Sequence, residues 1–587
     1  MLCVYKLLIL YSGTDKGVKS MKIMKLFRPL FTAIGGFLGI SEQIKLNIYA
    51  KNANKMQEKV LRDLMKDNKS TEYGKKNNFD KVKSIEDYQN IVPMSGYLDY
   101  EDYIMRMAKG EKGLITNRYI RRFTESSGST GRSKLVPLSG FSEWTIMCFS
   151  FSLPVGCAVK YFWKEKHKPL PPQRGLLTAE VNYRKTPGGA TVSCLSSIPF
   201  LNMKPIVKFY TCSPEEVMFP EADVDMDMHY VKLFFALQDE DISYLGTIFI
   251  TTLESMFFYL EENWEMFCDD IAKGKLNENV RIPDHIRASL QKKIKPNPKR
   301  AAKLRAEFEK GFDESAIVTR IWPKCGWMYG MGTGALSHYQ QRLRRYIGED
   351  MPIHYVGYAA TEALMAVPKE LNSYEYVILP QNAFFEFLPL DAPEGTKPLT
   401  IKDLEVGKEY ELILTNRSGF YRYRIEDVVK VTGYYHESPM VTFCYRLNQI
   451  ANISGEKINQ LAFDEIVGNF SDKMEEMFVG YSIYPDRDTS PGHYILLIEG
   501  TKEHTKEDEA VYAEEFEKCL CAGNVSVGPL IKSGALGHCE VKFLRHGTYD
   551  EYREMLRMNG ANLNQIKPIK VINSEERKEF FFNHTQF

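Results

Sequence analysis

Residues 123–138 read FTESSGSTGRSKLVPL, in which a serine- and glycine-rich segment lies between two short apolar runs. This pattern predicts a strand, a loop and a second strand. The glycines let the loop backbone approach a ligand, and free amides, hydroxyls and Lys134 can surround phosphate oxygens. The Walker spacing G-x-x-x-x-G-K-[ST] is absent. The alternative, a flexible linker or a plain hairpin turn, is disfavoured by the apolar residues on both sides.

Composition limits the classes of partner. A length of 587 residues exceeds what one hydrophobic core covers, so we expect a large domain divided into lobes and a smaller domain. Basic and acidic residues number 76 each, which argues against nucleic acid as a partner. Eleven scattered cysteines, without CxxC pairs or zinc spacing, favour a cytoplasmic location. We expect no transmembrane segment, because no run reaches the length that a span needs.

Hydrophobic periodicity predicts the order of elements along the chain. We predict helices over 41–67 and across most of 233–310, including Tyr244–Trp264, and successive strands from His354 onward. The segment Leu26–Ile40 is expected to pack on its own domain as a helix, the alternative being contact with a membrane or a partner. The predicted boundaries are a non-native or disordered start (1–20), an N-terminal domain (21–445), a hinge (446–452) and a C-terminal α+β domain (453–587).

Three further segments carry candidate chemistry. Glu362 ends the run Tyr358-Ala359-Ala360-Thr361-Glu362, where a carboxylate can hold Mg²⁺ that bridges ATP phosphates. In the alternating run from Ser418, Arg422 and Arg424 should face away from buried tyrosines. Asp427 is expected at a break before the next strand, where a carboxylate can accept two ribose hydroxyls. Lys567 lies in Asn564-Gln565-Ile566-Lys567-Pro568, where it can neutralise an α-phosphate. Taken singly, each residue is equally typical of ordinary solvated surface or strand-end positions.

Together and in this order, the segments resemble the auxin-responsive acyl-acid amido synthetase family, of the acyl-adenylate-forming, firefly-luciferase-like superfamily, in its bacterial type. The resemblance rests on SSGSTGRSKLVPLS, GTGALSHY, YAATE, YRYRIEDVVKVTGYY and NQIKP, and spans about Lys25 to Ile572. It implies an α/β fold class. A large multi-lobed N-terminal adenylate-forming domain would have mixed sheets and a β-barrel-like lobe, and a small mobile α+β C-terminal domain would follow.

The resemblance also implies ligands and residue roles. ATP and Mg²⁺ would be the cofactors, and a small-molecule carboxylic acid and an amine, such as an amino acid, the substrates of a monomer. Glu362 would bind Mg²⁺, Asp427 ribose, and Lys567 the α-phosphate; Glu362 and Lys567 are the catalytic candidates. Other nucleotide contacts would come from Ser126, Ser127, Gly128, Ser129, Thr130, Tyr358, Thr361 and Arg446.

The sequence departs from the family pattern at three positions. Ala335 and Ala360 stand where the family has serine, and Glu426 replaces a glycine before Asp427. A glutamate disfavours the positive φ that glycine allows, and it adds a negative charge near the nucleotide. The departures at Ala360 and Glu426 leave open a nucleotide-binding protein without catalysis. A second alternative, which does not depend on them, is a thioester ligase with CoA or a carrier protein as acceptor.

The acid itself is not identified by the sequence. Aromatic and aliphatic residues around Asn182–Tyr210 and Tyr244–Met256 predict walls for an apolar or aromatic acyl group, although such residues are also typical of a core.

Overall fold

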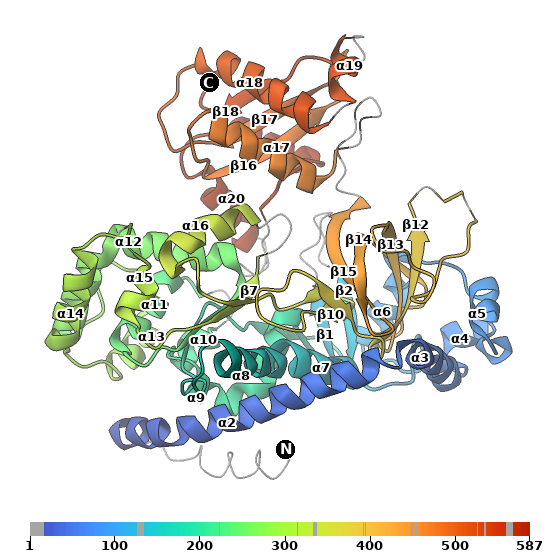
Figure 1. The fold of residues 1–587 in the computed structure, drawn as a ribbon, viewed down its shortest axis with the longest axis horizontal. Helices are drawn as coiled ribbons and strands as arrows, with labels where there is room; N and C mark the ends of the chain where they lie inside the picture. Colours follow the sequence, from blue (N-terminus) through green and yellow to red (C-terminus); the bar gives the residue numbers. More distant parts are fainter. Residues whose placement is uncertain are drawn as a thin grey trace. The chain divides into compact units, whose positions relative to one another are not determined.

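The computed structural model divides into two compact units (Figure 1). Unit 1 comprises Met1–Ser126, Leu135–Ile425 and Lys430–Thr442, and unit 2 comprises Ser127–Lys134, Glu426–Val429 and Phe443–Phe587. The structure describes residues 17–125, 134–221, 224–313, 315–332, 337–390, 392, 393, 395–447, 451, 453, 456, 458–524, 526–532, 536–558 and 568–587.

A parallel sheet forms the centre of one part of unit 1. Its strand order is β3 (Gly175–Leu177), β6 (Tyr244–Phe249), β7 (Met328–Met331) and β8 (Ile353–His354), and neighbouring strands are parallel. The strands are apolar runs because helices cover them, with α11 against β3 and α12 against β6. The helical prediction for Tyr244–Phe249 is therefore wrong: this segment is β6, and α12 begins at Ile250.

Two further sheets lie wholly or mostly in unit 1. A four-stranded sheet has the order β2 (Leu135–Ser139), β1 (Ile120–Glu125), β5 (Thr191–Ser193) and β4 (Tyr183–Lys185). A seven-stranded sheet has the order β12 (Ala383–Pro389), β13 (Glu409–Asn416), β14 (Tyr423–Tyr435), β15 (Ser438–Arg446), β11 (Tyr376–Ile378), β10 (Ala363–Val367) and β9 (Tyr358–Ala360). Within the described residues this sheet ends in edges at β12 and β9, so the predicted barrel-like lobe is an open sheet.

Helices surround these sheets. Those of unit 1 are α2 (Gly17–Ala50), α3 (Ala53–Asn68), α4 (Glu72–Lys76), η1 (Phe79–Lys81), α5 (Ile85–Ile91), η2 (Tyr97–Asp99), α6 (Glu101–Ala108), α7 (Gly140–Met147), the π-helical η3 (Cys148–Ser152), α8 (Leu153–Glu165), η4 (Leu195–Ser197), α9 (Ile198–Tyr210), α10 (Glu215–Met218), α11 (Met228–Gln238), α12 (Ile250–Lys273), α13 (Asp284–Gln291), α14 (Pro298–Phe308), α15 (Ile317–Ile321) and α16 (Ser337–Ile347). The stretch Gly140–Glu165 is long and apolar enough to cross a membrane, but 61% of its apolar window is buried, as in a core helix.

Unit 2 is a three-stranded sheet between helices. Its strands are β16 (Gly480–Asp486), β17 (His493–Glu499) and β18 (Glu540–Phe543), and its helices are α17 (Gln460–Lys473), α18 (Asp508–Gly523), α19 (Val527–Lys532), α20 (Thr548–Met558) and α21 (Glu575–Asn583). Successive side chains of β17 point to opposite faces of the sheet and enter two different hydrophobic cores. Leu496 belongs to the core with α17 and α18, whereas Ile495 and Leu497 belong to that with α20 and α21. An α+β arrangement of this part of the chain is confirmed.

Candidate active site

The serine- and glycine-rich segment connects two paired strands, as predicted. β1 and β2 are antiparallel, with Thr124 opposite Val136 and Glu125 opposite Leu135. Ser126, Ser127, Gly128, Ser129 and Thr130 lie outside the described residues. The base of the loop is nevertheless defined, because β1 ends at Glu125 and β2 begins at Leu135.

A hydrogen bond joins the base of this loop to the Glu362 segment. The buried Thr124 hydroxyl contacts the carbonyl oxygens of Val136 and Thr361, both at 3.2 Å. Thr361 and Glu362 form the two-residue connection between β9 and β10, where Ala360 pairs with Ala363. Tyr358, at the start of β9, is buried. Two segments that are 237 residues apart in the chain therefore meet here.

Asn416, which the sequence reasoning missed, holds the same hairpin from the other side. Its Nδ2 donates to the Glu362 carbonyl at 2.9 Å. Its Oδ1 accepts from the amides of Ser418, Gly419 and Phe420 at 2.9, 3.0 and 3.1 Å. The Asn-Arg-Ser-Gly sequence, typical of a turn, was the available signal. Asn416 thus fixes the backbone from which the Glu362 carboxylate projects.

We expect Asn416→Ala to lower the free energy of unfolding by about 2–3 kcal/mol, since it leaves several buried amides without an acceptor. Urea denaturation measures this change. Asn382→Ala is the matched control, because this buried side chain donates one hydrogen bond, to Leu364 at 2.9 Å, and should cost about 1 kcal/mol. Equal losses in the two variants would contradict the special role of Asn416.

Tyr97 is a second residue that the sequence did not indicate. Its hydroxyl donates to the Leu135 carbonyl and accepts from the Leu135 amide, both at 3.1 Å. Burial raises the pKa of Tyr97, and the carboxylates of Glu101 and Glu362 add to this effect against the hydrogen bond with Leu135. The Glu362 carboxylate therefore contributes to the raised pKa of Tyr97, whose hydroxyl is hydrogen-bonded to Leu135 at the end of the serine-rich loop.

Asp427 and Arg446 are joined by an ion pair. Arg446 Nε lies 2.6 Å from Asp427 Oδ1, and the Asp427 side chain is 3% exposed against 32% for Arg446. Asp427 lies inside β14, so the predicted break before the next strand is wrong. The irregularity at this point is Glu426, an exposed residue with φ +64°. Glu426, which stands where the similar family has glycine, therefore adopts the positive φ that glycine favours.

We expect Glu426→Gly to raise the free energy of unfolding by roughly 0.5–1 kcal/mol, because relief of left-handed strain exceeds the entropic cost of a glycine. Glu426→Ala removes the same carboxylate but keeps the Cβ atom. Urea denaturation should show a gain for the glycine variant alone; a gain in both variants would assign the effect to charge.

The neighbouring arginines each have a carboxylate of their own. Arg424 binds Glu411 through two contacts of 2.8 and 2.6 Å. Arg422 lies 3.2 Å from Glu386 and donates to the carbonyls of Gln89 and Val92, both at 2.8 Å. Tyr421, Tyr423 and Ile425 are buried, as the alternation predicted, but Arg422 is buried too rather than exposed on the opposite face.

Lys567 lies outside the described residues, but the segment after it is anchored on unit 2. The Ile483 amide donates to the Lys570 carbonyl at 2.8 Å, and the Ile572 amide donates to the Ile483 carbonyl at 2.8 Å. The Lys570 Nζ lies 3.6 Å from the centre of the Tyr481 ring. Ala335, the other departure in the family pattern, also lies outside the described part of the chain.

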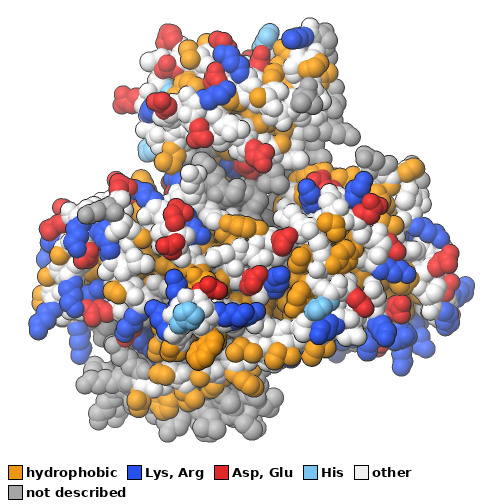
Figure 2. Space-filling view, in the orientation of Figure 1, with side chains coloured by type: hydrophobic (Ala, Val, Ile, Leu, Met, Phe, Trp, Pro, Cys, Tyr) orange, Lys and Arg blue, Asp and Glu red, His pale blue; other side chains and the backbone are white. Residues whose placement is uncertain are grey.

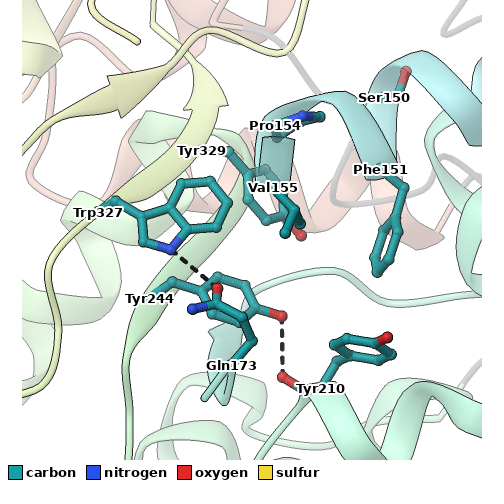
Figure 3. Close-up of a pocket in the computed structure, with 9 residues that line it drawn as sticks. All are labelled: Ser150, Phe151, Pro154, Val155, Gln173, Tyr210, Tyr244, Trp327 and Tyr329. Carbon is teal, nitrogen blue, oxygen red and sulfur yellow. Dashed lines mark hydrogen bonds between the residues drawn. The ribbon is translucent and has the colours of Figure 1, made fainter. Parts of the chain in front are cut away.

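An aromatic pocket lies at the amino ends of the parallel strands (Figure 3). Gln173 precedes β3, Tyr244 begins β6 and Trp327 precedes β7. The Tyr244 hydroxyl donates to the Tyr210 carbonyl, and Trp327 Nε1 donates to Gln173 Oε1, each at 3.0 Å. Tyr210 and Tyr244 both belong to the stretches predicted to hold the acid. The nucleotide candidate Tyr358, however, follows β8 in the chain, at the carboxyl ends of the parallel strands and therefore opposite to this pocket. The predicted acid pocket stays a prediction.

In the described ranges no three His, Cys, Asp or Glu side chains are grouped so as to hold a metal ion. This is compatible with Mg²⁺ at Glu362, because Mg²⁺ uses one or two carboxylates together with substrate phosphates and water.

Comparison with known proteins gives matches along most of the chain. Residues 43–353, 376–446 and 462–576 match the GH3 family N-terminal, central and C-terminal domains. The chain is 28% identical over 551 residues to the probable indole-3-acetic acid-amido synthetase GH3.1 of Arabidopsis thaliana, covering 89% of this chain and 90% of that one. It is 27% identical over 551 residues to jasmonoyl–L-amino acid synthetase JAR6 of Nicotiana attenuata, with 89% and 91% covered.

A solved structure shares the fold. The GH3.15 acyl acid amido synthetase superposes with a TM-score of 0.79 at 24% identity, covering 93% of this chain and 96% of the other.

Proposed function

Because this chain belongs to the GH3 family, we propose that it is an acyl-acid amido synthetase that activates a carboxylic acid with ATP and transfers the acyl group to an amino acid. The observation that carries the proposal is the hydrogen bond from Thr124 to Thr361, which joins the base of the serine-rich loop to the hairpin bearing Glu362. The relatives named as amido synthetases support the reaction class over nine-tenths of their length.

In this proposal each candidate residue contacts one part of the nucleotide. Ser126, Ser127, Gly128, Ser129 and Thr130 contact the phosphates. Tyr358 and Thr361 lie beside the adenine or the acyl phosphate, Asp427 accepts the ribose hydroxyls, and Arg446 contacts ribose or phosphate. Lys567 contacts the α-phosphate. The contact between Arg446 and Asp427 supports a shared ribose site, because it places a guanidinium donor beside a carboxylate acceptor.

Glu362 would hold Mg²⁺, which when bound neutralises charge on the phosphates. The carboxylate fits this role because hydrogen bonds fix the backbone of the hairpin, from Thr124 to the Thr361 carbonyl and from Asn416 to the Glu362 carbonyl. A carboxylate on a fixed backbone offers one oxygen ligand to a hard cation and leaves the other positions to phosphate and water.

The reaction proceeds in two displacements. An oxygen of the substrate carboxylate attacks the α-phosphorus of ATP, and the bond to pyrophosphate breaks, while loop amides and Lys567 stabilise the charge on the phosphate. The amine of the acceptor then attacks the acyl carbonyl, loses a proton, and AMP departs with the electron pair of the broken bond. We propose that the C-terminal domain rotates about residues 446–452 between the steps and shields the mixed anhydride from water.

The acceptor distinguishes this function from a thioester ligase. The protein would be incubated with ATP, Mg²⁺ and a panel of carboxylates, with either mixed amino acids or CoA, and the products analysed by mass spectrometry. An ATP-dependent N-acyl amino acid supports the proposal. Acyl-CoA formed without any amide would replace it with the thioester alternative. We also propose that the enzyme is a cytoplasmic monomer, which sedimentation and cell fractionation would test.

A further inference from the structure

The outer side of α2 carries an apolar stripe that unit 1 leaves uncovered. Leu26, Leu30, Phe37, Ile40, Ile44 and Ile48 are 76%, 54%, 73%, 39%, 55% and 52% exposed. Their spacing follows steps of three and four residues, which places them on one face of a helix. Together with the exposed Ala33 they extend the stripe over six turns. Figure 2 shows hydrophobic side chains gathered in this band.

The opposite side of α2 is fixed to unit 1. A Cβ atom on Gly39 would lie 2.3 Å from the backbone of Ser152 and Gly156, so the helix crosses at backbone contact with η3 and α8. Arg28 Nη1 lies 3.3 Å from Asp241, and Leu46 and Ala50 are buried. The stripe is therefore the outer face of a firmly packed helix, and the glycines serve this packing.

Exposed basic and aromatic side chains lie on α8, the helix that packs against α2. Gly36 faces Val159 and Gly39 faces Gly156, so α8 runs antiparallel to α2. Trp163 lies on α8 one turn beyond Val159. Trp163 is 71% exposed. Exposed Lys160, Lys164, Lys166 and Lys168 surround it, with Glu165 as the acid in this segment. Figure 2 shows Lys and Arg side chains next to the hydrophobic band.

The sequence of α2 is also poor in acidic residues. Residues 17–25 contain Lys19, Lys22 and Lys25 and no acid. From 26 to 50 the one acidic residue is Glu42, which is buried and pairs with Lys45 at 2.7 Å.

We propose that this face docks on an anionic lipid surface, with α2 lying in the plane of the membrane interface. A long stripe of bulky apolar residues, with an exposed tryptophan and exposed lysines on the neighbouring helix α8, has the features of an interfacial site. A coiled coil with a second copy would instead require opposite charges along both flanks of the stripe, and the one acid of α2 from residue 26 onward, Glu42, is buried. The inference is independent of the proposed reaction.

Vesicle flotation with the full chain tests the proposal. The protein should float with vesicles of equal parts phosphatidylcholine and phosphatidylglycerol, and binding should weaken with added salt and with pure phosphatidylcholine. The triple variant Leu30→Gln, Phe37→Gln, Ile44→Gln should lower the partition coefficient roughly tenfold or more. The matched control Leu98→Gln, Val406→Gln, Val511→Gln changes three residues that are 83%, 60% and 59% exposed elsewhere, and should bind as the wild type does.

Fluorescence gives a second readout that does not depend on the triple variant. The emission of exposed Trp163 should shift to shorter wavelength with anionic vesicles, and Trp163→Phe should abolish the shift. The proposal is overturned if the wild type stays with the soluble fraction, or if the triple variant binds equally well. It is also overturned if sedimentation shows a dimer that the triple variant disrupts, or if vesicles bind only after residues 1–16 are removed.

Discussion

Lys567→Ala should lower acid-dependent pyrophosphate exchange by roughly 10²–10³-fold, because one charge-stabilising donor for the transferring phosphate is lost. ATP binding should change far less, since the serine-rich loop, Asp427 and Arg446 are intact. The exchange rate and the dissociation constant for ATP, measured on the same preparation, separate these effects.

The matched control is Lys502→Ala, an exposed lysine of the same unit that contacts the Glu475 carbonyl at 2.8 Å. Its exchange rate should equal that of the wild type. If Lys567→Ala keeps the full exchange rate, the lysine has no part in adenylation.

Glu386→Ala should lower the free energy of unfolding by about 3–5 kcal/mol, because it leaves the buried Arg422 guanidinium without its carboxylate. The Glu386 side chain is fully buried and that of Arg422 is 6% exposed. Burial raises the pKa of the Glu386 carboxyl, and the charge of Arg422 opposes this rise. Arg422 also has φ +47°, a strained conformation that this ion pair and the hydrogen bonds to Gln89 and Val92 maintain.

Glu411→Ala provides the comparison within the same sheet. It removes the partner of Arg424, whose side chain is 45% exposed and remains solvated, so the cost should be about 1 kcal/mol or less. Urea denaturation of both variants measures the difference. Equal destabilisation would show that burial of the arginine does not determine the cost.

Local patterns predicted much of the fold. The strand–loop–strand around the serine-rich segment is confirmed, because apolar runs and glycines give a local signal. The mixture of helices and strands predicted for the C-terminal part of the chain is also confirmed. The helical prediction for Tyr244–Phe249 failed because a strand buried on both faces lacks alternation, so its apolar run resembles a core helix.

Long-range contacts of the candidate site could not be predicted without a structure. Asn416 and Tyr97 approach the Glu362 hairpin and the serine-rich loop from distant parts of the chain, and their own sequence neighbourhoods indicate only a turn and a helix start. Burial of Arg422 was missed for the same reason, since its partner Glu386 lies on another strand. The glycine-like φ of Glu426 could be anticipated only from the resemblance to the family.

Exchange of labelled pyrophosphate into ATP, measured against a panel of carboxylic acids, shows whether the protein forms acyl-adenylates. We expect exchange that requires an acid and Mg²⁺, proceeds without any amine, and is lost in Glu362→Ala and Lys567→Ala. Nucleotide binding without exchange for any acid in a broad panel would contradict this expectation and favour a protein that binds nucleotide without catalysis.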